Sequence, residues 1–316
     1  MSRAEEMAAT PLRRRGAGAA ASAAQQLRSA LGPLVDVKEP KDAEEPILGP
    51  RVRAALFAWL AEMNAAADLA AVGVKPRATA LLSGPPGCGK TTLAHHLAAR
   101  LGIPLVVVRA EMLVGKHLGE TGRNIATLFD TLIAAEIRCV VLMDEIDAIG
   151  SERSSDSQAC AREMNAALTV LLQRIEAFGG CLIAATNRPE ALDKALWRRF
   201  GLQITVDLPG VDERFAILKR YGLPFAFEDE TLDALTDLTA GAAPSLLRQV
   251  MEGAKRLLVV GPRLRIPIDR PASVFAAVIE GARPHPDYTP PPLWADPSLV
   301  GEIAAETWPP AREVAP

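Results

Sequence analysis

Apolar residues in the middle of the chain follow two alternating patterns. Short runs in which nearly every residue is apolar are typical of buried strands, and between them apolar residues recur every three to four positions, as on one face of a helix. The strand candidates, in chain order, are Thr79–Ser83, Pro104–Arg109, Cys139–Met143, Cys181–Ala185 and Gln203–Asp207. This alternation predicts an α/β fold in which a parallel sheet carries helices on both faces.

After Pro209-Gly210 the strand pattern stops and helical periodicity continues alone. The expected helices are Asp212–Tyr221, Thr231–Leu238, Pro244–Leu258 and Ala272–Glu280. Helices without intervening strands predict a separate, small helical lid domain. The predicted division is an N-terminal arm over 1–46, a large α/β domain over 47–210, the lid over 211–282 and a proline-rich tail over 283–316.

The two ends of the chain lack the central pattern. The arm is rich in Ala, Arg, Glu and Pro and has one helix-compatible patch, Ala19–Leu31, so we expect it to be flexible or lightly helical. The tail is dense in proline but carries Tyr288, Trp294 and Trp308. It is either disordered or an extended segment that docks through these aromatic side chains, and proline lowers the entropic cost of docking.

Composition narrows the function classes. The chain has 316 residues, 49% of them hydrophobic, and a formal net charge of −3, which gives no general attraction to polyanions such as nucleic acid. The alanine-rich region Ala54–Val74 is interrupted by Glu62, Asn64 and Asp68, which argues against a membrane span. The four cysteines show no CxxC spacing, so we expect neither a metal centre nor a disulfide framework, and a cytoplasmic location fits best.

A glycine-rich segment follows the first central strand and opens a helical pattern at Leu93–Leu101. Its residues are Gly84, Pro85, Pro86, Gly87, Cys88, Gly89, Lys90, Thr91 and Thr92. A strand, a glycine-rich turn and a helix N-terminus together form a phosphate cradle, because backbone N–H groups can approach the phosphates without interference from Cβ atoms. Lys90 would neutralise phosphate charge, and the Thr91 hydroxyl would ligate Mg²⁺.

Carboxylates end the strand that begins at Cys139. Asp144 is placed to hold the metal through water, and Glu145 to polarise a water that attacks the γ-phosphate. A solvated acidic turn is the alternative when this motif is taken alone. The next strand ends at Asn187, whose amide can orient the attacking water or bond the γ-phosphate; an Asx turn before Pro189 is the alternative.

Two adjacent arginines, Arg198 and Arg199, have no carboxylate in the same segment beyond Asp193, so they are candidates for an interaction elsewhere; a surface ion pair is the alternative. In combination these motifs resemble the AAA subfamily of AAA+ ATPases, with its second region of homology, over about residues 47–260. In this resemblance Gly84 to Thr91 match the Walker A motif and Val140 to Glu145 the Walker B motif. Asn187 matches sensor 1, and the two arginines match the arginine fingers of the katanin and spastin type.

The resemblance implies a ring hexamer of identical copies, with ATP and Mg²⁺ between protomers and both arginines acting in trans on the neighbouring copy's nucleotide. Such a finger is worth roughly 10³–10⁵ in turnover. Ile47 and Leu48 lie where the family packs the adenine. Arg248 is either a sensor 2 arginine or an arginine on a helix surface.

The segment Lys116, His117, Leu118 and Gly119 resembles the first pore loop of the family, which grips an extended polypeptide. His117 replaces the usual aromatic residue and offers less apolar area and a pH-dependent charge. The resemblance places a second loop at Ser151–Gln158 lower in the same channel.

The sequence therefore predicts a cytoplasmic ATPase that pulls on, unfolds or disassembles a protein substrate. Compact bacterial relatives of this single-module type can work beside a separately encoded protease, which makes a protease or client enzyme a candidate partner. One alternative is an assembly factor that uses nucleotide only to switch conformation, and His117 is its best support. A nucleic-acid loader is a further alternative, disfavoured by the acidic pI of about 5.9.

Overall fold

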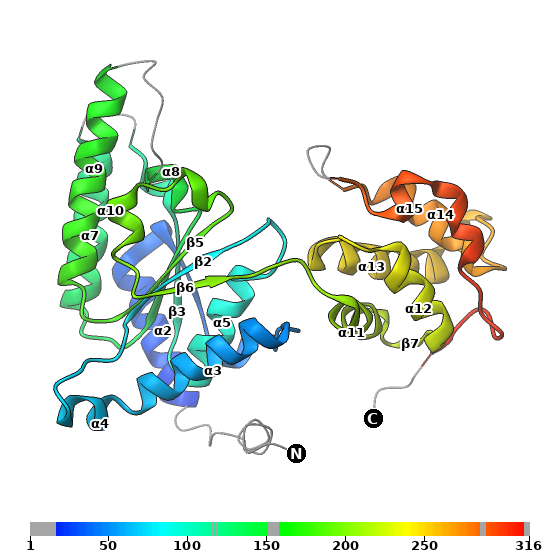
Figure 1. Ribbon diagram of the computed structural model, residues 1–316, viewed down its shortest axis with the longest axis horizontal. Helices are drawn as coiled ribbons and strands as arrows, with labels where there is room; N and C mark the ends of the chain where they lie inside the picture. Colours follow the sequence, from blue (N-terminus) through cyan, green and yellow to red (C-terminus); the bar gives the residue numbers. More distant parts are fainter. Residues whose placement is uncertain (1–16, 116, 118, 151–157, 285–288, 313–316) are drawn as a thin grey trace. The chain divides into compact units, whose positions relative to one another are not determined.

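The computed structural model describes residues 17–115, 117, 119–150, 158–284 and 289–312 (Figure 1). The chain divides into two compact units. The first, termed the α/β unit, contains the described residues up to Pro46 together with Ala54–Gly84 and Lys90–Thr205. The second, termed the helical unit, contains Ile47–Arg53, Pro85–Gly89 and the described residues from Val206 onward.

A six-stranded sheet forms the centre of the α/β unit, in the order β1-β3-β4-β5-β2-β6. The strands are β1 Val35–Lys38, β2 Thr79–Ser83, β3 Leu105–Arg109, β4 Val140–Asp144, β5 Cys181–Thr186 and β6 Leu202–Thr205. Strands β2 to β6 are parallel, which confirms the predicted α/β fold. The sheet is not wholly parallel, because β1 pairs antiparallel with β3.

Helices cover both faces of this sheet. The bounds are α2 Ala17–Leu31, α3 Pro50–Asn64, α4 Ala66–Ala71, α5 Lys90–Leu101, α6 Ala110–Leu113, α7 Glu120–Ala134, α8 Asp147–Gly150, α9 Gln158–Ala177 and α10 Lys194–Trp197, with short 3₁₀ turns at Gly32–Leu34, Pro40–Asp42 and Pro189–Ala191. Helices α7 and α9 lie side by side on one face, and α5 lies on the other (Figure 1). Apolar strand residues of one face, Val106, Val141 and Leu182 among them, are buried against α2, α7 and α9.

The described part of the N-terminal arm contains helix α2 at the predicted helix-compatible patch, followed by strand β1, and both pack into the core of the α/β unit. Leu27 and Leu31 of α2 and Val37 of β1 are buried in the same core as Phe129 of α7. The guanidinium of Arg28 also donates to the carbonyl of Val37 at 2.7 Å. Apolar residues at helical spacing followed by a short alternating strand give this segment enough buried surface to pack against the sheet.

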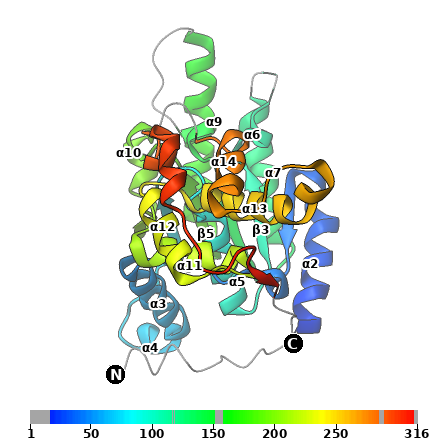
Figure 2. The same cartoon turned by 90° about the vertical axis from the view of Figure 1, so that its right-hand side faces the viewer.

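The helical unit contains the four helices expected after Pro209-Gly210, each with longer bounds (Figure 2). They are α11 Val211–Gly222, α12 Asp229–Leu238, α13 Pro244–Leu264 and α14 Pro271–Gly281, followed by the short helix α15 Pro292–Ala295 and a 3₁₀ segment at Pro297–Glu302. The sequence predicts no strand after Pro209-Gly210, but the structure contains a small antiparallel pair there, β7 Phe225–Ala226 and β8 Ala311–Arg312.

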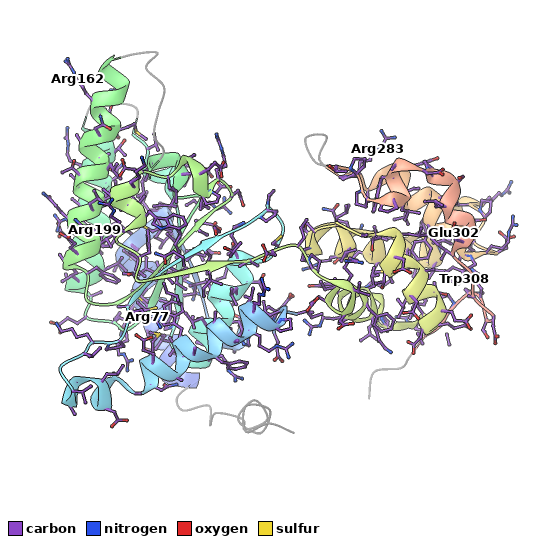
Figure 3. The ribbon with its side chains drawn as sticks, viewed as in Figure 1. Arg77, Arg162, Arg199, Arg283, Glu302 and Trp308 are labelled. Atoms are coloured by element: carbon purple, nitrogen blue, oxygen red, sulfur yellow. The ribbon has the colours of Figure 1, made fainter. Side chains whose placement is uncertain are left out.

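The described part of the tail belongs to the core of the helical unit. Leu293 and Ile303 are buried there, which excludes the disordered alternative for these residues. The indole N–H of Trp294 donates to the carbonyl of Ala282 at 2.6 Å, and that of Trp308, labelled in Figure 3, to the carbonyl of Ile268 at 2.8 Å. Tyr288, the third expected docking residue, lies outside the described residues. Within the described part of the chain, no helix combines the length and apolar character needed to cross a membrane.

Candidate functional site

The glycine-rich loop connects β2 to α5 through an unusual backbone. Gly84, Gly87 and Gly89 have φ angles of 144°, 77° and 86°, in a region that side-chain-bearing residues rarely adopt. Within the helical unit, the N–H of Ser245 donates to the carbonyl of Gly87 at 3.2 Å. A Cβ atom at Gly87 would lie 2.1 Å from the Ser245 hydroxyl oxygen, and the positive φ of Gly87 also favours glycine at this position.

Lys90 is the first residue of α5, and its side chain is buried, with 7% exposure. Its ammonium donates to the carbonyl of Gly84 at 2.7 Å and to the side-chain oxygen of Asn187 at 2.6 Å. A cation fixed at the end of the loop in this way is suited to an anionic phosphate group.

Thr91 and Asp144 place two oxygen ligands together. The Thr91 hydroxyl, on α5, donates to the Asp144 carboxylate at the end of β4 at 2.8 Å. The second oxygen of Asp144 accepts the backbone N–H of Glu145 at 3.1 Å. Hydroxyl and carboxylate oxygens are hard donors of the kind that Mg²⁺ prefers, so this pair fits the expected ion.

Glu145 follows the end of β4 with a φ of 55°, an uncommon angle for a residue other than glycine. Its pKa is raised from the ordinary value, first by lost hydration and then by the negative charges of Glu111, Asp144 and Asp147, while Arg109 acts in the opposite direction. The Glu145 side chain is exposed, with an uncommon backbone angle and several negative charges close by.

Asn187 lies at the carboxyl end of β5, and its side chain reaches Lys90. The turn that follows is held by a different residue, because the Thr186 hydroxyl accepts the N–H of Arg188 at 3.0 Å and donates to Asp147 at 2.8 Å. The Asn187 amide oxygen therefore accepts from Lys90 while Thr186 organises the turn before Pro189.

Arg198 and Arg199 follow α10, and both side chains are exposed. The guanidinium of Arg199, a residue labelled in Figure 3, forms an ion pair of 2.8 Å with Glu176 of α9. The surface ion pair considered from the sequence is thus present for Arg199. Its partner comes from a helix more than twenty positions earlier, which is why the local segment shows no sign of it.

The adenine and sensor 2 candidates lie in the helical unit. Ile47 packs, partly buried, against the helical core. The carbonyl of Leu48 accepts from the Arg53 guanidinium at 3.4 Å. Arg248 of α13 bonds Glu252 of the same helix at 2.7 Å and lies 5.1 Å from the ring centre of Tyr221 of α11, so contacts from both helices hold it.

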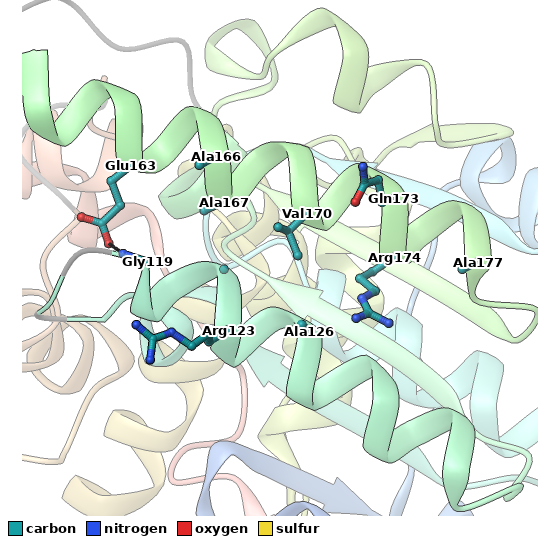
Figure 4. Close-up of a pocket in the computed structure, with 11 residues that line it drawn as sticks. Gly119, Arg123, Ala126, Glu163, Ala166, Ala167, Val170, Gln173, Arg174 and Ala177 are labelled. Atoms are coloured by element: carbon teal, nitrogen blue, oxygen red, sulfur yellow. Dashed lines mark hydrogen bonds between the residues drawn. The ribbon is translucent and has the colours of Figure 1, made fainter.

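Only part of the loop candidates is described: Lys116, Leu118 and 151–157 lie outside the described residues. The backbone N–H of His117 donates to the Glu120 carboxylate at 3.0 Å, and that of Gly119 to Glu163 of α9 at 3.2 Å. Figure 4 shows that Glu163 stands at one end of a shallow pocket between α7 and α9. Sequence reasoning missed Glu163, because nothing local marks its link to Gly119.

The glycine-rich loop, the buried Lys90 and the Thr91–Asp144 pair define a nucleotide-binding protein of the phosphate-loop α/β class. Residues 80–208 match the family described as "ATPase family associated with various cellular activities (AAA)". Residues 80–208 therefore carry an AAA ATPase domain, as the resemblance of the motifs indicates.

Several curated proteins are similar over this region. Proteasome-activating nucleotidase of Pyrococcus horikoshii is 38% identical over 185 residues, which cover 57% of this chain and 46% of that protein. The 26S proteasome regulatory subunit 10B homolog A of Arabidopsis thaliana is 36% identical over 187 residues, covering 57% and 46%. The uncharacterized AAA family ATPase y4kL of Sinorhizobium fredii is 38% identical over 177 residues, covering 55% and 52%. The match thus spans about half the length of these relatives.

Proposed function

We propose that this chain is an ATPase that assembles into a ring of identical copies, expected to be a hexamer, and uses ATP hydrolysis to pull on, unfold or disassemble a protein substrate. The observation that carries the proposal is the joint placement of Lys90, Asn187 and the Thr91–Asp144 pair at the carboxyl ends of neighbouring strands. Ligands of open α/β sheets bind at this edge.

Each of these residues has a role in the proposed reaction. Lys90 holds the β- and γ-phosphates through its ammonium, and Asn187 orients the attacking water. Glu145 accepts the proton of that water as it attacks the γ-phosphorus, and ADP leaves with its bridging oxygen. Thr91 and Asp144 would hold Mg²⁺, Asp144 through water, and the bound ion supplies charge neutralisation on the phosphates.

Arg198 and Arg199 complete the site of a neighbouring copy in this proposal. Their side chains are exposed on the surface of the α/β unit, whereas Lys90 supplies the positive charge of the copy's own site and bonds the neutral amide of Asn187. Positive charge supplied in trans would stabilise the developing negative charge on the transferred phosphoryl group. Hydrolysis would therefore depend on assembly.

A separately encoded protease or client enzyme is the proposed partner. Support comes from the relatives whose names describe them as proteasome-activating or as proteasome regulatory subunits. A nucleotide switch that does not thread its substrate is the second candidate, favoured by His117 at the position where the family has an aromatic residue. Replacing His117 by Ala or by Tyr separates the two candidates. If the loop grips a threaded substrate, substrate unfolding should be lost with Ala and retained or increased with Tyr.

The test of the proposed reaction is hydrolysis by Glu145→Gln. The amide cannot accept the proton of the attacking water, so hydrolysis should fall by about 10²–10⁴-fold while ATP binding persists. Normal hydrolysis by this variant would show that the base is misassigned. Because the stalled protein should retain what it acts on, affinity capture with ATP, compared with ADP, then identifies the partner; recovery of nuclease-sensitive DNA would favour a nucleic-acid role instead.

A further inference from the structure

The backbone directly after the arginine pair is held by side chains from elsewhere in the α/β unit. The Thr79 hydroxyl donates to the carbonyl of Arg199 at 2.9 Å and accepts the N–H of Gly201 at 3.0 Å. The side-chain amide of Gln203 donates to the carbonyl of Phe200 at 2.6 Å. One hydroxyl therefore ties the chain on both sides of Phe200, whose ring is buried in the core with 2% exposure.

Thr79 is itself held by rigid surroundings. It begins β2 and is paired in register with Leu182 of β5. Two residues earlier, Arg77 donates to Glu62 at 2.8 Å through Nε, and its carbonyl accepts the indole N–H of Trp59 at 2.8 Å. The Arg77 side chain also lies against Gly201, where an added Cβ would come within 3.2 Å of Arg77 Cγ. The segment after the arginines thus rests on a fixed surface.

A second contact holds the guanidinium of Arg199. Its ion pair with Glu176 of α9 measures 2.8 Å, so Arg199 is anchored at its carbonyl by Thr79 and at its side chain by Glu176. None of these contacts involves Arg198, whose side chain is exposed. Arg199 is therefore tied to its own copy, and Arg198 extends from a backbone that cannot shift freely.

We propose that Thr79 is a positioning residue for the arginine pair, with Glu176 as a weaker second tie, so that Thr79 of one copy governs hydrolysis in the adjacent copy. This inference rests on the proposed function. Thr79 begins β2, whereas the phosphate loop of the same copy follows the other end of that strand, about 13 Å away at 3.3 Å per residue. Direct contact with its own nucleotide is therefore not expected.

The first test compares two substitutions of Thr79. Thr79→Val keeps the branched shape but can neither donate nor accept, whereas Thr79→Ser keeps the hydroxyl. A displacement of about 1 Å at a reacting group can cost 10²-fold, so we expect kcat of Thr79→Val to fall by roughly 10- to 100-fold, with nucleotide affinity and oligomer mass unchanged. Thr79→Ser should retain kcat near that of the wild type. An unchanged kcat in Thr79→Val would overturn the proposal.

Matched controls set the scale of this effect. Thr131→Val makes the same change at a threonine of helix α7. Among the contacts of the described residues, the Thr131 hydroxyl bonds only the carbonyl of Thr127, so this variant should leave kcat unchanged. Glu176→Gln should lower kcat by only about two- to fivefold, because exposed ion pairs contribute little. A larger loss for Glu176→Gln than for Thr79→Val would reverse the proposed order of the two ties and refute it.

The decisive test mixes variants, since a purely structural defect of Thr79→Val would stay within its own copy. Thr79→Val subunits have an intact nucleotide site, and Glu145→Gln subunits have intact arginines. In a 1:1 mixture, random assembly places a competent neighbour beside half of the Thr79→Val sites, so hydrolysis should recover to about a quarter of the wild-type rate.

A reference mixture combines Glu145→Gln subunits with subunits of the double variant Arg198→Ala/Arg199→Ala, which take the place of the Thr79→Val subunits. Recovery of both mixtures supports the positioning role. Recovery of the reference mixture alone shows that Thr79 acts within its own copy and overturns the inference, while the trans arginines stand. Recovery of neither mixture overturns action in trans itself, and with it the part of the proposed function on which the inference rests.

Discussion

Replacing Lys90 by Met removes the one charge of the phosphate loop while keeping a side chain of similar length. The ammonium is buried and donates to Gly84 and Asn187 at 2.7 and 2.6 Å, so it is fixed at the point where the loop meets α5. In the proposed complex at least one of its N–H groups bonds a phosphate oxygen. Met offers no donor and no charge at this point.

The magnitude follows from the type of bond that is lost. A hydrogen bond to a charged group contributes about 1.5–3 kcal/mol, so the loss of one should weaken ATP binding by roughly 10- to 150-fold. Methionine also leaves the Gly84 carbonyl and the Asn187 oxygen without this donor. The ligand-free variant should therefore be less stable than the wild type, and each protein needs its own ligand-free baseline.

Thermal unfolding with and without ATP and Mg²⁺ measures the effect. At an ATP concentration of about 100 times the wild-type Kd, binding should stabilise the wild type by about 2.7 kcal/mol and Lys90→Met by only about 0.3–1.4 kcal/mol. Lys75→Met is the matched control, because Lys75 is exposed in the loop before β2 and should leave the stabilisation unchanged. Equal stabilisation of Lys90→Met and wild type would refute the assignment of Lys90 to the phosphates.

Three further predictions concern other parts of the chain. Thr91→Ala removes one proposed Mg²⁺ ligand, so the Mg²⁺ concentration for half-maximal hydrolysis should rise about tenfold; an unchanged value would contradict that role. Trp308→Ala should lower the free energy of unfolding by about 2–4 kcal/mol and Trp308→Phe by about 1 kcal/mol in denaturant titrations, and equal stability would contradict the packed tail. Gly115→Ala should increase proteolytic cleavage near His117, because the new Cβ would lie 2.3 Å from that of Glu120; unchanged cleavage would contradict this crowding.

The parts of the fold that sequence could predict are those with a strong local signal. The centre of Thr79–Ser83 is apolar and buried, and the segment precedes the glycine-rich loop; the predicted strand and its bounds agree with the structure. The order of strand, loop and helix also places Lys90 and Thr91 at the start of α5. In both cases the residues that decide the conformation are neighbours in sequence.

The parts that could not be predicted depend on contacts between distant residues. Leu27, in an alanine-rich segment, and Val37, between charged residues, have no local signal of burial, and only the sheet and α7 give them a surface to pack against. The sequence alone does not show where Trp308 packs. Its place depends on the hydrogen bond from its indole N–H to the distant carbonyl of Ile268. Thr79 carries no motif, since its relation to Arg199 spans 120 positions.

The most direct test of the central claim is the rate of ATP hydrolysis per subunit as a function of protein concentration, with oligomeric mass measured on the same samples. We predict that the rate per subunit rises as copies assemble and then reaches a plateau, because Arg198 and Arg199 act on a neighbouring copy. A rate per subunit that stays constant from the monomer to the assembled form would contradict it, as would the absence of hydrolysis at every concentration.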